Sequence, residues 1–367
     1  MVRHLALNKD YHPSSPVLGS VEAPEHATLG AKAFKLAPSS PEGPLVVLWN
    51  SLPTFSNIVS YILVPLTLPF AAFHFVFNIY SMLRTRNTLE GKVVLITGAS
   101  SGLGKALAAV FYREGCRLIL CSRNKDQLAS VRLELLQKPS NRETVYPPVI
   151  VPMDLADIGQ IGVKAGEALG IYGHVDLLVN NAGISYRGEV VHTNLEVDQQ
   201  LMQVNYMGTV ALTKAILPSM IQRKAGHVVM VSSVQGKIGI PFRSCYSASK
   251  HALQAFSDCL RAEVHQDKIG VTVIDPGYIQ TNLSMNAVTG SGERYGMMDK
   301  TTASGETPEK VASEIIRAVK QGKKELVIAS FTTRLAIYLR TVFPALFFVI
   351  MNHRASKKEG AVNTKQE

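Results

Sequence analysis

The chain has 367 residues, 46% of them hydrophobic and 18% charged, so it is long enough to bury the core of one large domain with extensions. Its 38 basic and 28 acidic residues give a net charge of +10, but no basic stripe interleaved with aromatic residues is present, so we do not expect nucleic-acid binding. The four cysteines show neither metal-ligand spacing nor a disulfide framework, so we expect no metal site.

The N-terminal part of the chain changes character near residue 43. Residues 1–42 are polar, rich in Pro, Ser, Ala and Gly, and are expected to form a disordered tail without a signal peptide. Residues 43–86 are expected to form a membrane anchor, because residues 58–83 exceed the ~20 apolar residues that a helix needs to cross a bilayer. The alternatives are a buried hairpin and a helix lying in the membrane surface. Basic residues after the anchor place the rest of the chain in the cytosol by the positive-inside rule.

Residues 92–104, KVVLITGASSGLG, are typical of a buried strand, a glycine-rich turn and the start of a helix. Glycines allow positive φ angles and let the backbone approach a pyrophosphate, whose charge is stabilised at a helix N-terminus. An ordinary tight turn is the alternative. The candidate binding residues of this loop are Thr97, Gly98, Ser100, Ser101, Gly102, Leu103 and Gly104.

From residue 87 to residue 330, predicted strands and helices alternate, which indicates a Rossmann-like α/β fold with helices on both faces of a doubly wound parallel sheet. Further strands are expected at residues 117–121, 149–151, 174–179, 227–231, 271–274 and 325–329. Helices are expected at residues 195–214 and 244–263, and again after Thr307, with Pro308 in the first turn. Residues 282–305 are expected to form a loop.

Ser122 and Arg123 follow the second predicted strand, where a dinucleotide-binding fold distinguishes a ribose hydroxyl from a ribose phosphate. A carboxylate at this place would repel a 2′-phosphate, whereas a guanidinium group binds it through a fork of donors. The sequence therefore favours NADP(H) over NAD(H). The alternative is that Arg123 is only a surface residue at a strand end.

Tyr246 and Lys250 are four residues apart in a predicted helix and should share one face. The Lys250 ammonium, together with an oxidised nicotinamide ring, should lower the pKa of the Tyr246 phenol, so that Tyr246 can exchange a proton with a carbonyl or alcohol oxygen. Ser233 can hydrogen-bond the same oxygen, and Asn205 can hold a water that links Lys250 to solvent. Each residue alone has a plainer explanation: a surface Tyr–Lys pair, a strand-end Ser or a helix Asn.

Residues 87–329 resemble the short-chain dehydrogenase/reductase family. The matching motifs are Thr97-Gly98-x-x-x-Gly102-x-Gly104, Asp154, Asn180-Asn181-Ala182-Gly183, Asn205, Ser233, Tyr246-x-x-x-Lys250 and Pro276-Gly277. The resemblance implies that Ser233 and Tyr246 act on the carbonyl and that Lys250 binds the nicotinamide ribose. It also implies a homodimer formed through the helices that contain Asn205 and Tyr246. The remaining implied cofactor contacts are Pro276, Gly277, Ile279 and Thr281 at the nicotinamide, Asp154 and Leu155 at the adenine, and Asn181, Ala182 and Gly183 near the ribose.

Residues 331–367 form an apolar segment with a basic tail. The longest uncharged run, residues 341–351, is too short to span a bilayer. We expect this segment to lie in the membrane interface, to line the entrance for a lipophilic substrate, or to pack on the core as a helix. His353, Arg354, Lys357 and Lys358 suit anionic headgroups.

Several segments, among them ISYRGEV and DPGYIQTNLSMNAVTGSGERYGMMD, resemble a group of single-pass oxidoreductases of the endoplasmic reticulum membrane within this family. The catalytic part of that group is assigned to the lumen, against the positive-inside rule, so both sides stay open. We expect a membrane-anchored enzyme that transfers hydride between NADP(H) and a lipophilic carbonyl or alcohol. The alternatives are a non-catalytic nucleotide-binding interaction protein and an NAD-dependent alcohol dehydrogenase.

Overall fold

The computed structural model describes residues 88–137 and 146–363, together with residues 68, 69, 72, 73, 75 and 76. The expected tail at residues 1–42 and nearly all of the expected anchor at residues 43–86 lie outside the described residues. Within the described part of the chain, no helix has both the length and the apolarity needed to cross a bilayer. Residues 1–73 and 74–367 form separate units, and the elements below belong to the second.

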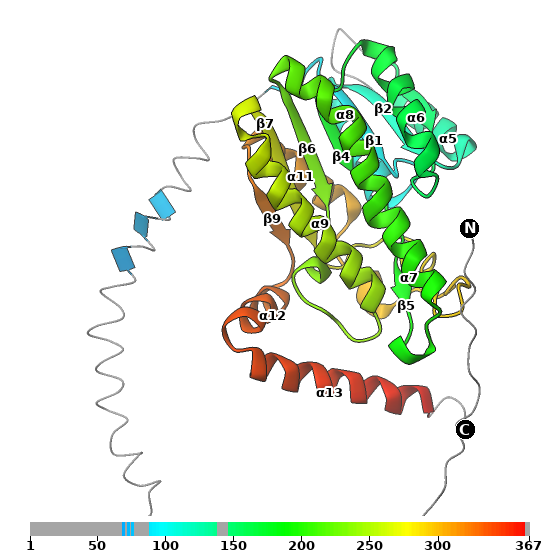
Figure 1. The fold of residues 1–367 in the computed structure, drawn as a ribbon. Coiled ribbons are helices and arrows are strands. Elements are labelled where there is room, and N and C mark those ends of the chain that lie inside the picture. Colours follow the sequence, from blue (N-terminus) through cyan, green and yellow to red (C-terminus); the bar gives the residue numbers. More distant parts are fainter. Residues whose placement is uncertain (1–67, 70–71, 74, 77–87, 138–145, 364–367) are drawn as a thin grey trace, which may run out of the picture. The chain divides into compact units, whose positions relative to one another are not determined.

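A seven-stranded sheet lies at the centre of this second unit, in the order β3-β2-β1-β4-β6-β7-β9, with every neighbouring pair parallel (Figure 1). Its strands are β1 (Val93–Thr97), β2 (Arg117–Ser122), β3 (Val149–Pro152), β4 (Leu177–Asn180), β6 (Gly226–Val231), β7 (Ile269–Pro276) and β9 (Glu325–Ile328). The strand order reverses between β1 and β4. Ligands bind such sheets at the carboxyl ends of the strands that flank this reversal.

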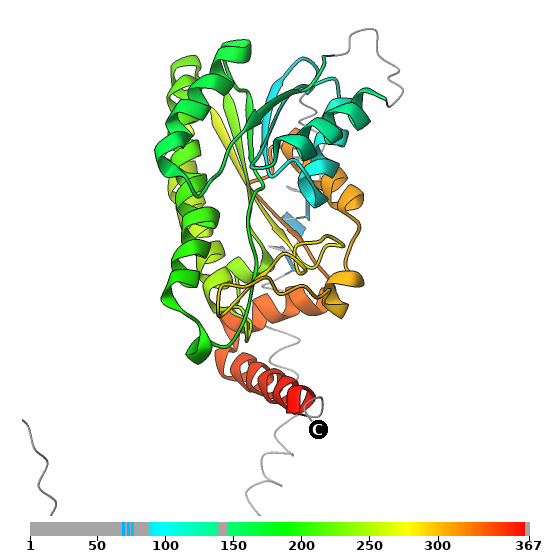
Figure 2. The ribbon, with the colours of Figure 1, turned by 90° about the vertical axis from the view of Figure 1, so that its right-hand side faces the viewer.

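Helices cover both faces of the sheet (Figure 2). The helices α4 (Gly102–Arg113), α5 (Lys125–Leu136) and α11 (Pro308–Lys320) pack on one face, and α6 (Ile158–Tyr172), α8 (Thr209–Arg223) and α9 (Ser244–Glu263) on the other. In β1, Val94 and Ile96 face the first layer while Val93 and Leu95 face the second. Because strand side chains alternate between faces, a fully apolar strand fits both layers. The predicted Rossmann-like fold is confirmed.

The prediction of a single helix at residues 195–214 is wrong, because the helix is interrupted and ends later than expected. The structure has α7 (Leu195–Met202), then a π-helical stretch Gln203–Gly208 that contains Asn205, then α8, which continues to Arg223. A π-helical turn inserts a residue into an otherwise α-helical run. The apolar spacing across it still resembles a helix, so the sequence pattern does not reveal the insertion.

Residues 282–305, expected as a loop, contain two short elements. The strand β8 (Val288–Thr289) pairs in parallel with β5 (Tyr186–Arg187), and α10 (Lys300–Ala303) follows.

The strand expected at residues 174–179 begins three residues later than expected, at Leu177. The Thr307 cap is confirmed, because its hydroxyl accepts a hydrogen bond of 3.4 Å from the backbone N–H of Lys310. Short 3₁₀ helices span Val190–His192, Val234–Gly236 and His265–Asp267.

Two helices, α12 (Phe331–Val342) and α13 (Pro344–Asn363), take the place of the single C-terminal segment expected at residues 331–367. The break falls at Phe343 because Pro344 cannot continue a helix and disfavours helical dihedral angles in the residue before it. No side chain of α12 is buried. Phe347 in α13 is buried, but the large apolar side chains around it are exposed. Packing on the core therefore does not explain the apolar character of this segment.

Candidate active site

A cleft of about 700 Å³ lies at the carboxyl ends of β1, β2, β4, β6 and β7. It brings together every site residue expected from the sequence except Asn205, which is fully buried. The expected residues that line it are Thr97, Gly98, Ser100, Ser101, Gly102, Leu103, Gly104, Ser122, Arg123, Asp154, Leu155, Asn181, Ala182, Gly183, Ser233, Tyr246, Lys250, Pro276, Gly277, Ile279 and Thr281. The roles of these residues stay predictions.

The glycine-rich turn between β1 and α4 has a backbone that other residues would distort. Gly98 and Gly102 have φ angles of 66° and 49°, in the left-handed region that favours glycine. A Cβ atom on Gly104 would collide with the carbonyl oxygen of Gly98. The side chain of Ser101 makes no capping hydrogen bond to α4, so the first N–H groups of this helix remain available to an anion. This arrangement fits the diphosphate of a dinucleotide.

Thr97 and Asn181 join the loops that follow β1 and β4. The Thr97 hydroxyl accepts hydrogen bonds of 3.0 Å from the backbone N–H groups of Asn181 and Ala182. The Asn181 side chain donates to the Thr97 carbonyl at 3.0 Å. The Asn181 side-chain amide therefore bonds β1 and shapes the wall of the cleft, and the place near the ribose that the resemblance implies for Asn181 stays a prediction.

The end of β2 presents an exposed arginine to the cleft. Among the described residues, Arg123 has no hydrogen-bond or ion-pair partner. Ser122 donates to the Asn124 carbonyl at 3.4 Å, and Asn124 caps α5. Asp154, across the cleft, accepts a hydrogen bond of 2.9 Å from the backbone N–H of Ala156. An unpaired guanidinium group at this place suits a phosphate on the ribose.

Ser233, Tyr246 and Lys250 lie at the other end of the cleft, each only 4–7% exposed. The Ser233 hydroxyl accepts from the backbone N–H of Gln235 at 3.1 Å and donates to the Pro276 carbonyl at 3.4 Å. The Lys250 Nζ atom donates to the carbonyl of Val231 at 3.0 Å and lies 5.8 Å from the centre of the Tyr246 ring. The first turn of α9 and the end of β6 therefore place a phenol, a hydroxyl and an ammonium group together.

Burial shifts the pKa values of Tyr246 and Lys250. It raises the pKa of Tyr246 above its ordinary value, against a hydrogen bond from Ser233 and the positive charges of Arg187 and Arg243, which lower it. Burial also lowers the pKa of Lys250 to about 8. The sequence predicted a lowered pKa for Tyr246 caused by Lys250 together with an oxidised nicotinamide ring, and the effect of the nicotinamide stays a prediction. In the structure burial outweighs the lowering effects, and the cations that lower this pKa are two arginines that the sequence did not single out.

Asn205 lies behind the catalytic wall and anchors the loop after β4. Its Oδ1 atom accepts from the backbone N–H of Ile184 at 2.8 Å, and its Nδ2 atom donates to the Ile184 carbonyl at 2.9 Å and to Ser249 at 3.0 Å. Both amide hydrogens are thus used, while one lone pair on Oδ1 remains. A Cβ atom on Gly183 would lie 3.1 Å from this oxygen and 3.5 Å from Lys250 Nζ, so both groups border one space. The water between them stays a prediction.

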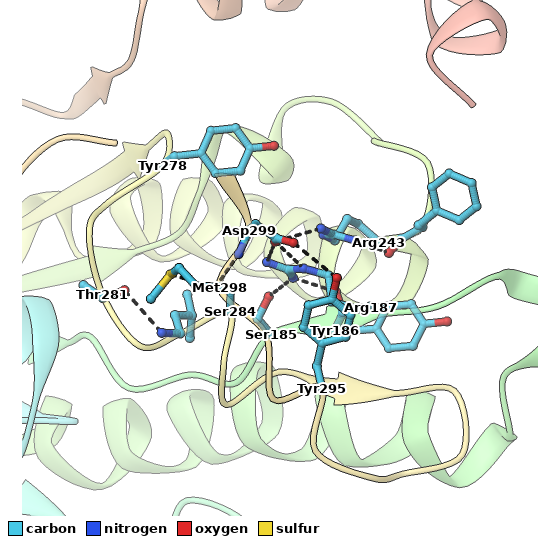
Figure 3. A network of polar contacts seen from close by, with 12 residues as sticks. Ser185, Tyr186, Arg187, Arg243, Tyr278, Thr281, Ser284, Tyr295, Met298 and Asp299 are labelled. Atoms are coloured by element: carbon cyan, nitrogen blue, oxygen red, sulfur yellow. Dashed lines mark hydrogen bonds and ion pairs between the residues drawn. The ribbon is translucent and has the colours of Figure 1, made fainter. Parts of the chain in front are cut away.

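Arg187, Arg243 and Asp299 form a charged group beside the cleft that sequence reasoning missed. Asp299 Oδ2 lies 2.6 Å from Arg187 Nη2 and 3.2 Å from Arg243 Nη2. Figure 3 shows both guanidinium groups directed at this carboxylate. Asp299 is 112 residues from Arg187 and 56 from Arg243 in the chain, so no local spacing signals the contact.

Comparisons with known proteins give one consistent family. Residues 92–291 match the family model described as short chain dehydrogenase. The chain is 51% identical over 305 residues to a Xenopus laevis protein named dehydrogenase/reductase SDR family member 7B, an alignment that covers 83% of this chain and 94% of that protein.

Two solved structures share the fold. A short-chain dehydrogenase/reductase from Burkholderia phymatum in complex with NAD has a TM-score of 0.63 and 23% identity, over 71% of this chain and 96% of that one. An alcohol dehydrogenase from Thermococcus sibiricus complexed with 5-hydroxy-NADP has a TM-score of 0.56 and 25% identity, over 66% of this chain and 97% of that one.

Proposed function

Because the chain belongs to the short-chain dehydrogenase/reductase family of oxidoreductases, we propose that it transfers hydride between NADP(H) and a lipophilic carbonyl or alcohol. The observation that supports this most directly is that Ser233 and Tyr246 border the same cleft as the glycine-rich turn. A dinucleotide held at the turn would thus share the cleft with a proton donor.

The reaction needs a hydride at the carbonyl carbon and a proton at the carbonyl oxygen. A reduced nicotinamide, when bound, supplies the hydride. The Tyr246 hydroxyl donates its proton to the carbonyl oxygen, which becomes the alcohol, and Tyr246 is left as phenolate. The Ser233 hydroxyl turns from the Pro276 carbonyl to donate a hydrogen bond to the same oxygen, where it stabilises the charge that develops. The phenolate regains a proton from solvent by way of the Lys250 ammonium, whose pKa of about 8 suits proton exchange near neutral pH. Alcohol oxidation follows the reverse path.

We propose NADP(H) as the cofactor because Arg123 lies unpaired at the end of β2 among the described residues. The Arg123→Asp variant should bind NADPH about 10- to 100-fold more weakly, because it loses charge-assisted hydrogen bonds and gains a repelling carboxylate. NADH binding should be unchanged or stronger. Titration of both cofactors against intrinsic fluorescence measures this.

The matched control for the cofactor test is Arg132→Asp, which makes the same charge change at an exposed arginine on α5 outside the cleft. This variant should keep the NADPH affinity of the original protein. A preference for NADH in the original protein would contradict the proposal and favour an NAD-dependent alcohol dehydrogenase. The Burkholderia and Thermococcus neighbours were solved with an NAD and an NADP compound respectively, so they do not decide between the two.

We propose that the protein is anchored in the endoplasmic reticulum membrane by a single span within residues 43–86. The absence of Lys, Arg, Asp and Glu from residues 43–83 supports this, as do the exposed apolar side chains of α12 and α13. Arg354 of α13 donates to the hydroxyl of Tyr278 at 3.3 Å, and Tyr278 lines the cleft. α13 thus contacts a residue of the cleft, and its exposed apolar side chains support a lipophilic substrate that enters beside the C-terminal helices.

The anchor is tested on the intact chain in microsomes. After extraction with alkaline carbonate the protein should stay in the membrane pellet, and its release into the supernatant would contradict a spanning anchor. Protease treatment of sealed microsomes then shows on which side the catalytic unit lies. From the family resemblance we propose a homodimer formed through the helical run that contains Asn205 (α7, the π-helical stretch and α8) and through α9, which contains Tyr246. Light scattering on the purified protein measures whether it is a dimer.

Catalysis itself is tested by a screen of carbonyl compounds with NADPH and the purified full chain. We expect oxidation of NADPH with long-chain or polycyclic ketones or aldehydes, and little with short polar ones. A protein that binds NADPH but turns over nothing in a broad panel would favour the non-catalytic, nucleotide-binding alternative.

A further inference from the structure

Arg187, Arg243 and Asp299, called here the arginine–aspartate cluster, form a nearly buried group of charges. Arg187 and Arg243 are 8% and 7% exposed, and the side chain of Asp299 is 14% exposed. Two positive charges surround one negative charge, so the cluster has a net charge of +1. Charges that water does not reach are weakly screened, and their field extends to neighbouring groups.

Hydrogen bonds fix both guanidinium groups in place (Figure 3). Arg187 donates to Asp299 through Nε at 2.7 Å and to the Ser185 hydroxyl and the Tyr186 carbonyl through Nη1 at 2.7 and 2.8 Å. Arg243 donates to Asp299 at 3.2 Å and to the Phe242 carbonyl at 2.8 Å. Neither side chain can turn toward solvent without breaking these bonds. The net positive charge is therefore a fixed feature of the fold.

The cluster lies next to the catalytic phenol. Arg243 directly precedes α9, and Tyr246 is the third residue of that helix. Tyr186, the neighbour of Arg187, packs with Tyr246 in one small apolar cluster. Arg187 also lines the cleft together with Tyr246. Both arginines, on β5 and at the start of α9, are close enough for their charges to lower the pKa of Tyr246.

We propose that Arg187 and Arg243 are positioning residues that supply a positive field stabilising the Tyr246 phenolate, a field that persists at pH values where Lys250 loses its charge, and that Asp299 limits the strength of this field. The proposal rests on the proposed role of Tyr246 as proton donor, although the field itself can be measured without turnover. Lys250 cannot supply a constant field, since burial lowers its pKa to about 8 and its ammonium is partly deprotonated near that pH. An arginine remains charged at this pH.

Other titratable groups near Tyr246 and the cluster stay neutral or are common to all variants of the cluster. Burial raises the pKa of Cys245 to about 12 and raises the pKa values of Tyr186 and Tyr295, so these three are neutral near pH 8. Other charged or titratable groups on the neighbouring elements include Lys250 and His251 on α9, Asp198 on α7, Tyr278 after β7, Lys300 on α10, and Glu293 and Arg294 at the cleft. All variants of the cluster retain these groups. Burial and the charge of Arg187 lower the pKa of Arg243 to about 10, so Arg243 loses charge in the range where Tyr246 ionises, which weakens the expected shifts without reversing their signs.

The test follows the ionisation of Tyr246 directly, by NMR of the full chain in detergent with ¹³Cζ-labelled tyrosine. The chain has 12 tyrosines, so the Tyr246 signal is identified by its loss in Tyr246→Phe. Arg187→Met removes a positive charge and should raise the titration midpoint by about one pH unit. Asp299→Asn leaves two positive charges and should lower the midpoint by about one unit. The double variant Arg187→Met/Asp299→Asn restores a net charge of +1 and should return the midpoint close to its original value.

Opposite shifts that cancel in the double variant distinguish an electrostatic role from a structural one. Arg187→Lys, which keeps the charge, should leave the midpoint nearly unchanged. So should Arg294→Met, which removes an exposed arginine at the cleft whose charge water screens. NADPH binding shows which variants remain folded, and the double variant and Arg187→Lys still test the charge if a single variant unfolds. Equal midpoints in all folded variants, or shifts of Arg187→Met and Asp299→Asn in one direction, would overturn the proposal. A failed substrate search would count against the proposed function only.

Discussion

The Tyr246→Phe variant should lose about 10²- to 10⁴-fold in kcat for carbonyl reduction, the range that a positioned general acid contributes. The substitution removes one oxygen atom and keeps the ring, so the packing of Tyr246 against Tyr186 and Cys245 is preserved. The cofactor half of the cleft, formed by the turn between β1 and α4, is unaffected. NADPH affinity should therefore stay within about twofold while turnover falls. Steady-state kinetics and a fluorescence titration on the same sample measure both.

The control for this prediction is Tyr206→Phe, which removes a phenolic hydroxyl from the π-helical stretch outside the cleft. The Tyr206 ring packs edge-on against Phe256, a contact that phenylalanine keeps. Its kcat should match that of the original protein. Full activity of Tyr246→Phe would remove Tyr246 from the mechanism. Loss of NADPH binding in that variant would indicate damage to the fold instead, and the two results can be told apart in one experiment.

The fold of the catalytic unit could be predicted because its strands are buried on both faces. Such a strand reads as a short continuous apolar run, as residues 93–96 do, and the helix between two runs must cross over to keep the strands parallel. The helix expected at residues 244–263 has the same bounds in the structure. Where the pattern lacks a period the prediction fails, as in residues 282–305, because two-residue strands such as β5 and β8 are too short to show alternation.

In the candidate site, likewise, contacts between residues close in the chain could be predicted and contacts between distant residues could not. Tyr246 and Lys250 could be placed together from the sequence because a four-residue spacing in a helix is a local constraint. The arginine–aspartate cluster could not, because β5 and the loop around Asp299 must first be brought to the start of α9 by the tertiary fold. The hydrogen-bond partner of the Asn181 amide could not be predicted for the same reason. Its partner Thr97 lies 84 residues away, on a strand that becomes a neighbour only when the sheet forms.

The Gly104→Ala variant should lose at least about tenfold in NADPH affinity and about 1–3 kcal/mol in the free energy of unfolding. The methyl group would enter the space of the Gly98 carbonyl, and the Asn181 side-chain nitrogen would lie only 2.7 Å from it. Both neighbours are held: Gly98 by its own left-handed backbone, and Asn181 by its hydrogen bond to the Thr97 carbonyl. The overlap can be relieved only by moving α4 away from the turn, which displaces the N–H groups that would bind the diphosphate.

Gly162→Ala is the matched control, because it adds the same methyl group within the helix α6. There, nothing lies within 4 Å of the new Cβ atom. An alanine in a helix interior is favoured over glycine by about 0.5–1 kcal/mol, so this variant should be slightly more stable and bind NADPH normally. If the close approach at Gly104 shapes the cofactor site, calorimetric unfolding should show a loss of stability for Gly104→Ala and a small gain for Gly162→Ala. NADPH titration should show weaker binding for Gly104→Ala alone. Equal NADPH affinities in the two variants would mean that the turn can relax around a side chain, and that the diphosphate is held elsewhere in the cleft.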